Sequence, residues 1–234
     1  MTTLFISDLH LPAQPSTLRD IFIQFLEGPA LKADALYILG DLFEYWIGDD
    51  VGMQVYAREV SRLAALTARG VPVYFLHGNR DFLVGSHFAQ ISGVQILPDP
   101  SMIDLYGHPT LLTHGDLFCT DDLGYQRWRR FSRNAVAQWC YLRMPVTWRE
   151  RVAGSARSKS NYKPQAIMDV NTTAIAAAFE TWNTQHMIHG HTHRPADHRD
   201  EHGRARIVLA DWTPQRMEAL AVDTSGMRRI SLLA

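Results

Sequence analysis

The chain has 234 residues, of which 46% are hydrophobic and 20% are charged, which is the composition of an ordinary globular protein. No apolar stretch approaches the ~20 residues of a membrane-spanning helix, and the N-terminus lacks the basic start and long apolar run of a signal peptide. Two cysteines are too few for a disulfide framework or a four-thiolate zinc site, so a reducing cytoplasmic setting is expected. Taken together, these features disfavour secreted, fibrous, disordered and integral-membrane proteins.

The net charge of −1 hides a strongly basic middle segment. Residues 125–163 hold ten lysines and arginines and a single acid, Glu150, which gives this segment a charge of +9 and leaves −10 for the rest of the chain. A basic block of this kind predicts an anionic partner, such as a phosphate, a nucleic acid or a membrane surface.

Five short apolar runs are predicted to be strands buried on both faces, because each is continuous and stops at Gly, Asp, Asn or His. They span residues 4–6, 35–39, 71–76, 110–113 and 187–188. Apolar residues at helical spacing over 18–26 and 55–66 lie between the first of these runs. This alternation of strand and helix predicts an α/β fold in layers.

The later part of the chain follows other patterns. Residues 205–209, 218–222 and 228–233 are predicted to form three strands without helices between them, that is, a meander that makes the sheet mixed. Asn171 is a candidate N-cap for a helix that ends near Trp182.

The basic segment is predicted to be a helical insertion over residues 122–165, within a single domain that covers 1–234. One helix face would carry its apolar residues, which are Trp128, Phe131, Ala135, Trp139 and Leu142. Pro145 would end that helix, and a second helix would follow over about 147–157.

Residues of metal-ligand type follow the early strands. This set comprises Asp8, His10, Asp41, Asn79, His114, His191 and His193. A single residue of this kind is more often a turn former or a hydrogen-bonded polar group. Strand ends in layered α/β folds, however, converge at one edge of the sheet. Five apolar runs that are each followed by a residue able to bind a metal therefore favour a metal site. Carboxylate, amide and imidazole ligands without thiolate suit manganese, iron or zinc, and seven are enough for two ions that share a carboxylate.

The ordered set resembles a known family. The signature of the calcineurin-like metallophosphoesterases is similar to Asp8-x-His10, Gly40-Asp41, Gly78-Asn79, His114-Gly115-Asp116 and Gly190-His191-x-His193. The resemblance implies a four-layer αββα sandwich with mixed sheets and two metal ions at the strand ends. It assigns Asp8, His10 and His193 to one ion and Asn79, His114 and His191 to the other, with Asp41 bridging.

The residue after Gly78-Asn79 departs from many members of that family, which have His there as a proton donor to the leaving group. Arg80 is permanently charged and cannot act as an acid, but it can bind a phosphate with two hydrogen bonds. A pyrophosphate substrate fits, because its leaving phosphate needs no proton. The alternative is that Arg80 pairs with Asp81 or Asp116.

Further stretches resemble the branch of the family that acts in lipid A biosynthesis. They cover residues 38–44, 46–50, 77–83, 119–122, 167–170 and 188–195. This resemblance implies that water attacks the α-phosphorus of UDP-2,3-diacylglucosamine and yields UMP and 2,3-diacylglucosamine 1-phosphate. It also implies two Mn²⁺ ions and peripheral attachment to the cytoplasmic side of a bacterial inner membrane.

The same resemblance implies residue roles. Arg80 and Asp41 would be catalytic, and the substrate contacts would be Asn79, Arg80, Asp122, Ser160, Lys163 and His191. Glu44 and Asp49 are candidates to hydrogen-bond ligand histidines or are solvated loop charges.

Three roles stay open for the apolar face of the insertion: contact with the membrane, an acyl-chain groove, and docking on the core. Two other functions compete with the lipid hydrolase, namely a phosphoesterase for nucleotides or nucleic acid and a scaffold without activity. The leading expectation is a lipid-linked UDP-sugar substrate, with neither nucleic acid nor an obligate protein partner.

Overall fold

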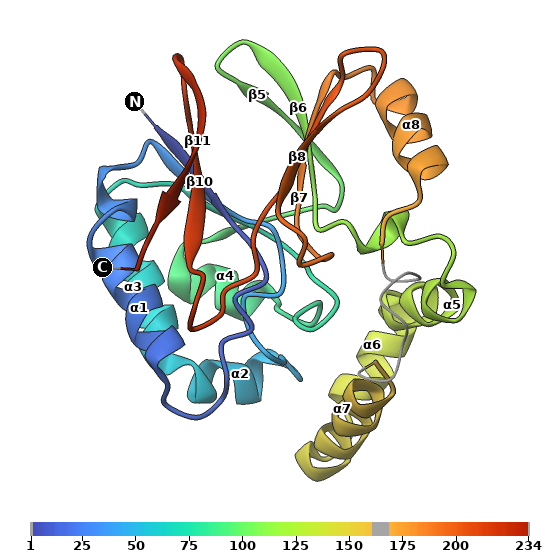
Figure 1. Cartoon of the computed structure of the whole chain (residues 1–234). Helices are drawn as coiled ribbons and strands as arrows, with labels where there is room; N and C mark the ends of the chain where they lie inside the picture. Colours follow the sequence, from blue (N-terminus) through green and yellow to red (C-terminus); the bar gives the residue numbers. More distant parts are fainter. Residues whose placement is uncertain (1, 161–168, 234) are drawn as a thin grey trace.

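The computed structural model describes residues 2–160 and 169–233, without the side chains of 156–160, and places two β-sheets face to face between helices (Figure 1). The first sheet has the order β11-β10-β1-β2-β3-β4. Its strands are β1 (Thr3–Ile6), β2 (Ala35–Ile38), β3 (Val73–Leu76), β4 (Gln95–Leu97), β10 (Glu218–Asp223) and β11 (Gly226–Ser231). Strands β1 to β4 run parallel, and β10 is antiparallel to β1, so the sheet is mixed.

The second sheet has the order β5-β6-β7-β9-β8. Its strands are β5 (Ser101–Leu105), β6 (His108–Thr113), β7 (His186–His189), β8 (Ala196–Arg199) and β9 (Ala205–Val208). Strands β6, β7 and β9 are parallel, and the two edge strands are antiparallel to their neighbours.

Helices lie on the outer face of each sheet, and three others, between residues 123 and 160, form the insertion that projects from the sandwich (Figure 1). They are α1 (Thr17–Glu27), α2 (Asp49–Val55), α3 (Ala57–Ala68), α4 (Ser86–Ser92), α5 (Leu123–Ser132), α6 (Ala135–Leu142), α7 (Val146–Ser160) and α8 (Thr172–Thr181), with short 3₁₀ turns η1 (Ala30–Lys32) and η2 (Asp116–Phe118). Helices α1, α3 and α4 bury Phe22, Leu63 and Phe88 in the core against the first sheet, and α8 packs Phe179 against Met187 of the second. Between the sheets lies a separate apolar core that includes Phe5 and Ile188. The predicted αββα sandwich is confirmed.

The predicted meander of three strands is wrong. Strand β9 joins the second sheet beside β7, and only β10 and β11 form a hairpin, in the first sheet. The chain crosses between the sheets at Trp212, whose backbone N–H donates to the Asp8 carbonyl at 3.1 Å and whose ring packs edge-on against Phe22 and Phe25. As a result, β9 and β10, which follow each other in sequence, lie in different sheets.

The insertion contains a break that the apolar spacing did not predict. Instead of one helix across 128–142, α5 ends at Ser132 and α6 begins at Ala135. The Asn134 side chain causes the new start, since its Oδ1 accepts the N–H groups of Val136 and Ala137 at 3.0 and 3.2 Å. The Asn171 cap of α8 is confirmed by the same geometry, with the N–H groups of Thr173 and Ala174 at 2.9 and 3.1 Å. None of the helices in the described residues has the length and apolarity needed to cross a bilayer.

A buried ion pair joins α1 to α3. The Arg19 guanidinium donates to both carboxylate oxygens of Glu59 at 2.8 and 2.6 Å, and it also donates to the carbonyls of Ala13 and Val55. Glu59 is fully buried and Arg19 is 8% exposed. The pair therefore fixes the loop that follows the first strand end.

We expect Glu59→Ala to lower the free energy of unfolding by about 3–5 kcal/mol, because it leaves the Arg19 charge buried without its partner. The matched control is Arg58→Ala on the same helix. Its ion pair with Asp20 is more than half exposed, so its loss is expected to cost under about 1 kcal/mol. Urea denaturation of both variants checks this, and equal midpoints would contradict it.

Candidate metal centre and adjoining cavity

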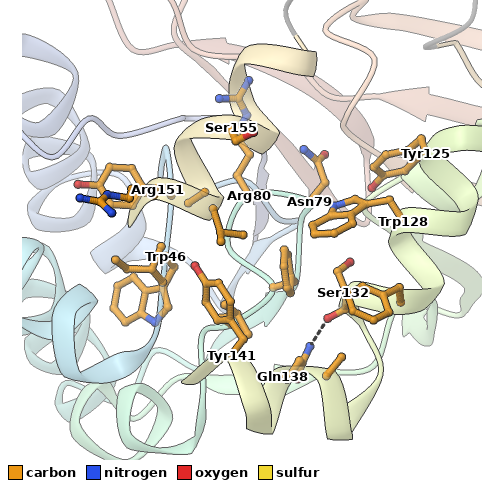
Figure 2. Close-up of a pocket in the computed structure, with 18 of the residues that line it drawn as sticks. Trp46, Asn79, Arg80, Tyr125, Trp128, Ser132, Gln138, Tyr141, Arg151 and Ser155 are labelled. Carbon is orange, nitrogen blue, oxygen red and sulfur yellow. Dashed lines mark hydrogen bonds between the residues drawn. The ribbon is translucent and has the colours of Figure 1, made fainter. Parts of the chain in front are cut away.

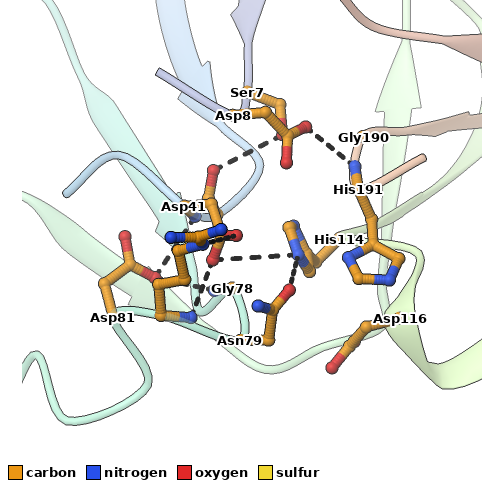
Figure 3. A network of polar contacts seen from close by, with 12 residues as sticks. Ser7, Asp8, Asp41, Gly78, Asn79, Asp81, His114, Asp116, Gly190 and His191 are labelled. Carbon is orange, nitrogen blue, oxygen red and sulfur yellow. Dashed lines mark hydrogen bonds and ion pairs between the residues drawn. The ribbon is translucent and has the colours of Figure 1, made fainter. Parts of the chain in front are cut away.

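The polar residues that follow the strands meet at one edge of the sandwich (Figure 3). Asp8 and Asp41 follow β1 and β2, Asn79 follows β3, and His114 and His191 follow β6 and β7. This convergence arises because these strands are parallel within each sheet, so their carboxyl ends share an edge.

Asp8, His10 and His193 form one compact group. The Nε2 atoms of His10 and His193 lie 3.1 Å apart, and Asp8 Oδ1 lies 3.9 and 3.5 Å from them respectively. Their ligand atoms all lie within 4.8 Å of one another, which is a spacing that one metal ion could fill.

Asp41 lies between this group and a second one. Its Oδ2 is 3.8 Å from His10 Nδ1, and its Oδ1 is 3.9 Å from His114 Nε2. Asn79 Oδ1 lies 3.0 Å from the same His114 nitrogen, and the ring centroid of His191 is 5.0 Å from that of His114. Asp8 also lies within reach of Asp41 and His114. The structure thus brings all seven predicted residues together.

The hydrogen bonding of His114 leaves one ring nitrogen for a ligand. Its Nδ1 lies 2.8 Å from the Leu39 carbonyl, an acceptor only, so Nδ1 carries the proton and Nε2 faces the centre. Burial disfavours a charged ring, but the carboxylates of Asp41 and Asp8 outweigh it and raise the pKa of His114 to about 9, so a metal ion bound at Nε2 would replace a proton there. Burial, with Asp81 and Asp8 nearby, raises the pKa of Asp41 to about 7. The centre therefore concentrates negative charge that a cation would neutralise.

Two buried atoms of this centre have no hydrogen-bond partner among the described residues, namely Asp8 Oδ1 and His10 Nδ1. Unsatisfied buried polar atoms are costly and rare, and here they face other ligand-type atoms. Oxygen and imidazole donors without thiolate fit manganese, iron or zinc. The residues present therefore fit a pair of metal ions.

The backbone at the centre adopts conformations that side chains rarely occupy. Positive φ angles occur at Asp8 (57°), His10 (47°), Asp41 (51°), His191 (70°) and His193 (55°). Such residues cost about 1–3 kcal/mol each and gather at functional sites. The surrounding sheets therefore hold these ligands in place at a cost in stability.

Two glycines let the strand ends approach closely. A Cβ atom at Gly78 would collide with the Asp41 carboxylate, and one at Gly190 would collide with Ser7 Oγ and Asp8 Oδ2. Any side chain at either position would displace a ligand.

Asp81 is a residue whose role the sequence did not reveal. Its buried carboxylate accepts the N–H groups of Gly78, Asp41 and Leu42 at 2.9, 3.2 and 2.7 Å. It thereby fixes the ends of β2 and β3 relative to each other. The sequence did show an acidic residue two positions after Asn79. Its partners, however, are main-chain N–H groups, which no pattern of side chains reveals.

Arg80 faces the centre and does not pair with Asp81 or Asp116. Its Nη1 donates to Glu44 Oε1 at 2.6 Å, and its Nε lies 3.8 Å from Asp41 Oδ2. Glu44 Oε2 in turn lies 3.9 Å from His10 Nδ1, which is too far for a hydrogen bond.

Asp49 has a structural role, so both interpretations offered for it are wrong. It accepts Trp46 Nε1–H and the N–H groups of Gly85 and His87 at 2.9–3.0 Å. These contacts fasten the start of α4 to the start of α2.

The remaining predicted substrate contacts lie on the insertion. Asp122 caps α5, where its Oδ1 accepts Tyr125 N–H at 2.8 Å. Ser160 is the last residue of α7, and its side chain lies outside the described atoms. Lys163 lies outside the described residues.

A cavity of about 710 Å³ opens between the insertion and the loops after β2 and β3 (Figure 2). Asn79 and Arg80 line the cavity beside the metal centre. Most of the remaining wall is apolar, including Trp46, Phe82, Leu83, Trp128, Phe131 and Tyr141.

Tyr141 of the insertion packs against the core of the first sheet, whereas most of the predicted apolar stripe is exposed. Trp128 and Phe131 are 42% and 61% exposed but line the cavity. Trp139 and Leu142 do not line it and are 57% and 42% exposed. The interpretation as a core-docking stripe is therefore wrong.

Residues 1–195 match the family described as calcineurin-like phosphoesterase. A UDP-2,3-diacylglucosamine hydrolase of Serratia proteamaculans is 49% identical over 91% of each chain, and one of Nitrosococcus oceani is 50% identical over 91% of this chain and 88% of its own. A solved archaeal phosphodiesterase aligns with a TM-score of 0.50 at 13% identity over 99% of both chains, which supports the fold.

Proposed function

Because the chain belongs to the calcineurin-like phosphoesterase family, we propose that its centre hydrolyses UDP-2,3-diacylglucosamine, the substrate in the names of its relatives, and that it does so at the pyrophosphate. The chain is thus a hydrolase of lipid A biosynthesis. One observation carries the choice of substrate: the cluster of ligand residues opens, at Asn79 and Arg80, into a largely apolar cavity. A charged head at one end and fatty chains at the other match that layout.

Two Mn²⁺ ions are proposed as the cofactors. Asp8, His10 and His193 would hold one ion, Asn79, His114 and His191 the other, and Asp41 would contact both. Bound cations of this kind lower the pKa of water and offset charge on phosphoryl oxygens. The carboxylate, amide and imidazole donors are consistent with manganese.

The protein's own residues orient the substrate. Arg80 presents guanidinium N–H groups toward Asp41 and can bind a phosphoryl group with two hydrogen bonds. These hydrogen bonds strengthen as negative charge develops on the phosphoryl oxygens. Arg80 cannot donate a proton, so the leaving group must be a weak base. Attack at the α-phosphorus satisfies this, because 2,3-diacylglucosamine 1-phosphate departs as a phosphate and UMP remains.

The insertion over 122–165 is proposed to cover the acyl chains, which occupy the cavity. Trp128 and Phe131 from α5 and Tyr141 from α6 would contact them, opposite Phe82 and Leu83. A volume of about 710 Å³ lies within the usual range of ligand sites, roughly 300–1,000 Å³.

The outer face of the insertion is proposed to attach the protein peripherally to the cytoplasmic side of the bacterial inner membrane. Val136, Trp139 and Trp148 are 69%, 57% and 60% exposed, and the Arg143 guanidinium lies 3.7 Å over the Trp139 ring. Exposed aromatics among arginines are typical of helices that lie on anionic lipid.

The substrate assignment is tested by comparing UDP-2,3-diacylglucosamine, UDP-glucose and single-stranded DNA, each with Mn²⁺ and with EDTA. We expect manganese-dependent release of UMP from the acylated substrate alone. Equal turnover of both UDP-sugars would contradict the lipid reading, and DNA cleavage would favour the nucleic-acid alternative.

Two tryptophans separate acyl contact from membrane contact. Trp128→Ala removes a cavity wall and is expected to lower kcat/KM for the diacyl substrate by about 10–100-fold, the value of one buried aromatic contact. Trp139→Ala should leave turnover in detergent unchanged but weaken sedimentation with anionic vesicles. A deacylated analogue is the control for Trp128→Ala, and equal losses on both substrates would indicate folding damage instead.

A further inference from the structure

We propose that Arg133, together with Tyr125 on α5, positions the Asn79 side of the dinuclear centre, so that the insertion is part of the metal-binding scaffold as well as a cover for the acyl chains. The inference rests on the proposed function, since it requires two metal sites. It concerns residues outside the ligand set itself.

Helix α5 is fastened to the second sheet mainly through the buried carboxylate of Asp116, with a further pair between Arg129 and Asp99 at 3.2 Å. Tyr125, Arg129 and Arg133 are four residues apart, so they share a helix face. All three approach Asp116: the Tyr125 hydroxyl donates to it, Arg129 Nε donates at 2.9 Å, and Arg133 Nη2 lies at 3.7 Å. Asp116 is fully buried two residues after His114, so the helix is held at the edge where the ligands converge.

Arg133 extends this attachment to the first sheet. Its Nη2 donates to the Gly78 carbonyl at 2.9 Å, and its guanidinium carbon lies 5.4 Å from the centre of the Phe82 ring. The carbonyl of Gly78 belongs to the same peptide plane as the Asn79 nitrogen. The contact therefore fixes the plane from which the Asn79 side chain projects.

The two polar groups of Gly78 are thus held from opposite sides. Its N–H donates to Asp81 of the core at 2.9 Å, and its carbonyl accepts from Arg133 of the insertion. Since Gly78 can carry no side chain here, these two hydrogen bonds replace the side-chain packing that would orient another residue. Loss of the Arg133 bond leaves the peptide held from the core alone.

Tyr125 makes the matching contact on the other sheet. Its ring lies nearly parallel to that of His191, 24° between planes and 6.3 Å between centroids. Asn79 and His191 are both assigned to the second ion. By contrast, the Asp8 carbonyl is held by the Trp212 N–H at 3.1 Å, and the Asp8 carboxylate by Ser7 Oγ at 2.6 Å. The α5 contacts therefore predict an effect on one metal site more than on the other.

Arg149 offers a matched control at the other end of the insertion. It is 2% exposed on α7, donates to the Ile47 carbonyl at 2.6 Å, and pairs with Asp50. Its replacement loosens the insertion where it meets the start of α2, rather than where it meets Gly78.

The experiment is calorimetric titration of the metal-free full chain with Mn²⁺, comparing wild type with Arg133→Met, Arg133→Lys and Arg149→Met. We expect Arg133→Met to weaken one of two Mn²⁺ sites by about 10–100-fold, as loss of a group that orients a metal ligand does, with the other site changed less than threefold. Arg133→Lys keeps a donor and should recover part of the affinity. Arg149→Met should leave both sites unchanged.

Arg133→Leu, which like methionine has no donor, is expected to show the same selective loss, so the test does not depend on the folding of one variant. Because the defect is in metal affinity, kcat of Arg133→Met should rise toward wild type as Mn²⁺ is increased. Unchanged titrations, equal weakening of both sites, or the same defect in Arg149→Met would overturn the inference. A wild type that binds no pair of Mn²⁺ ions would instead contradict the proposed function.

Discussion

We expect Asp41→Ala to abolish hydrolysis and the binding of two Mn²⁺ ions together. Asp41 is the carboxylate whose two oxygens face the two ligand groups, at His10 and at His114. Loss of one electrostatic contact to a reacting centre costs about 10²–10³-fold in rate, so a residue that serves both ions should cost about 10⁴-fold or more.

The measurements for Asp41→Ala are steady-state release of UMP and the metal content of the purified variant. Asp41→Asn keeps the volume but lowers the charge and should also lose most activity. Asp20→Asn, an exposed carboxylate on α1, is the control for the general effect of removing an acid. An Asp41→Ala variant that retains more than a few per cent of turnover would show that Asp41 does not bridge the ions.

The second large effect is expected from Arg80→Ala, which should lower kcat/KM by about 10²–10³-fold as removal of a transition-state donor does. The reason is its position beside Asp41, at the entrance from the metal centre to the cavity. Arg80→Lys should recover little, because an ammonium group cannot make the paired hydrogen bonds of a guanidinium.

Glu44→Gln separates the two roles that Arg80 could have. Glu44 is the carboxylate to which Arg80 donates at 2.6 Å, and its amide variant keeps an acceptor without the charge. If Arg80 acts on the substrate, Glu44→Gln is expected to be much milder than Arg80→Ala. A loss below threefold in Arg80→Ala would mean that the arginine serves only to hold Glu44.

Much of the layered core was predictable because strands buried on both faces need continuous apolar runs. Residues 35–39 and 71–76 are such runs, and β2 and β3 lie within them. The metal centre followed for a related reason: ligand-type residues that end parallel strands must meet. A sequence therefore reveals a site of this kind even though its members are far apart.

Other features depend on pairing that no local pattern records. Strand β8 is largely exposed and its sequence is Ala-Asp-His-Arg, so it has neither an apolar run nor an alternation of apolar and polar residues. Strand β4 has three residues at a sheet edge. Strand β9 joins the second sheet by pairing with β7, and Trp212 then contacts Asp8 and Phe25 on the other side of the fold; both are distant in sequence from the residues they contact.

The cavity was also beyond the sequence. The spacing of Trp128, Phe131 and Trp139 correctly indicates an apolar face, but the Asn134 cap divides it between two helices. As a result Trp128 and Phe131 line the cavity, whereas Trp139 does not. A single helix would have placed all three on one surface.

The absence of side chains at Gly78 and Gly190 bears on how this enzyme could change over generations. At both positions the smallest possible addition, a methyl group, would strike a ligand carboxylate. In a saturation library scored by growth, these two glycines should therefore be as intolerant as Asp8 or Asp41. Resistance to a compound that occupies the pocket would have to arise elsewhere, in the walls that the α5 and α6 helices contribute.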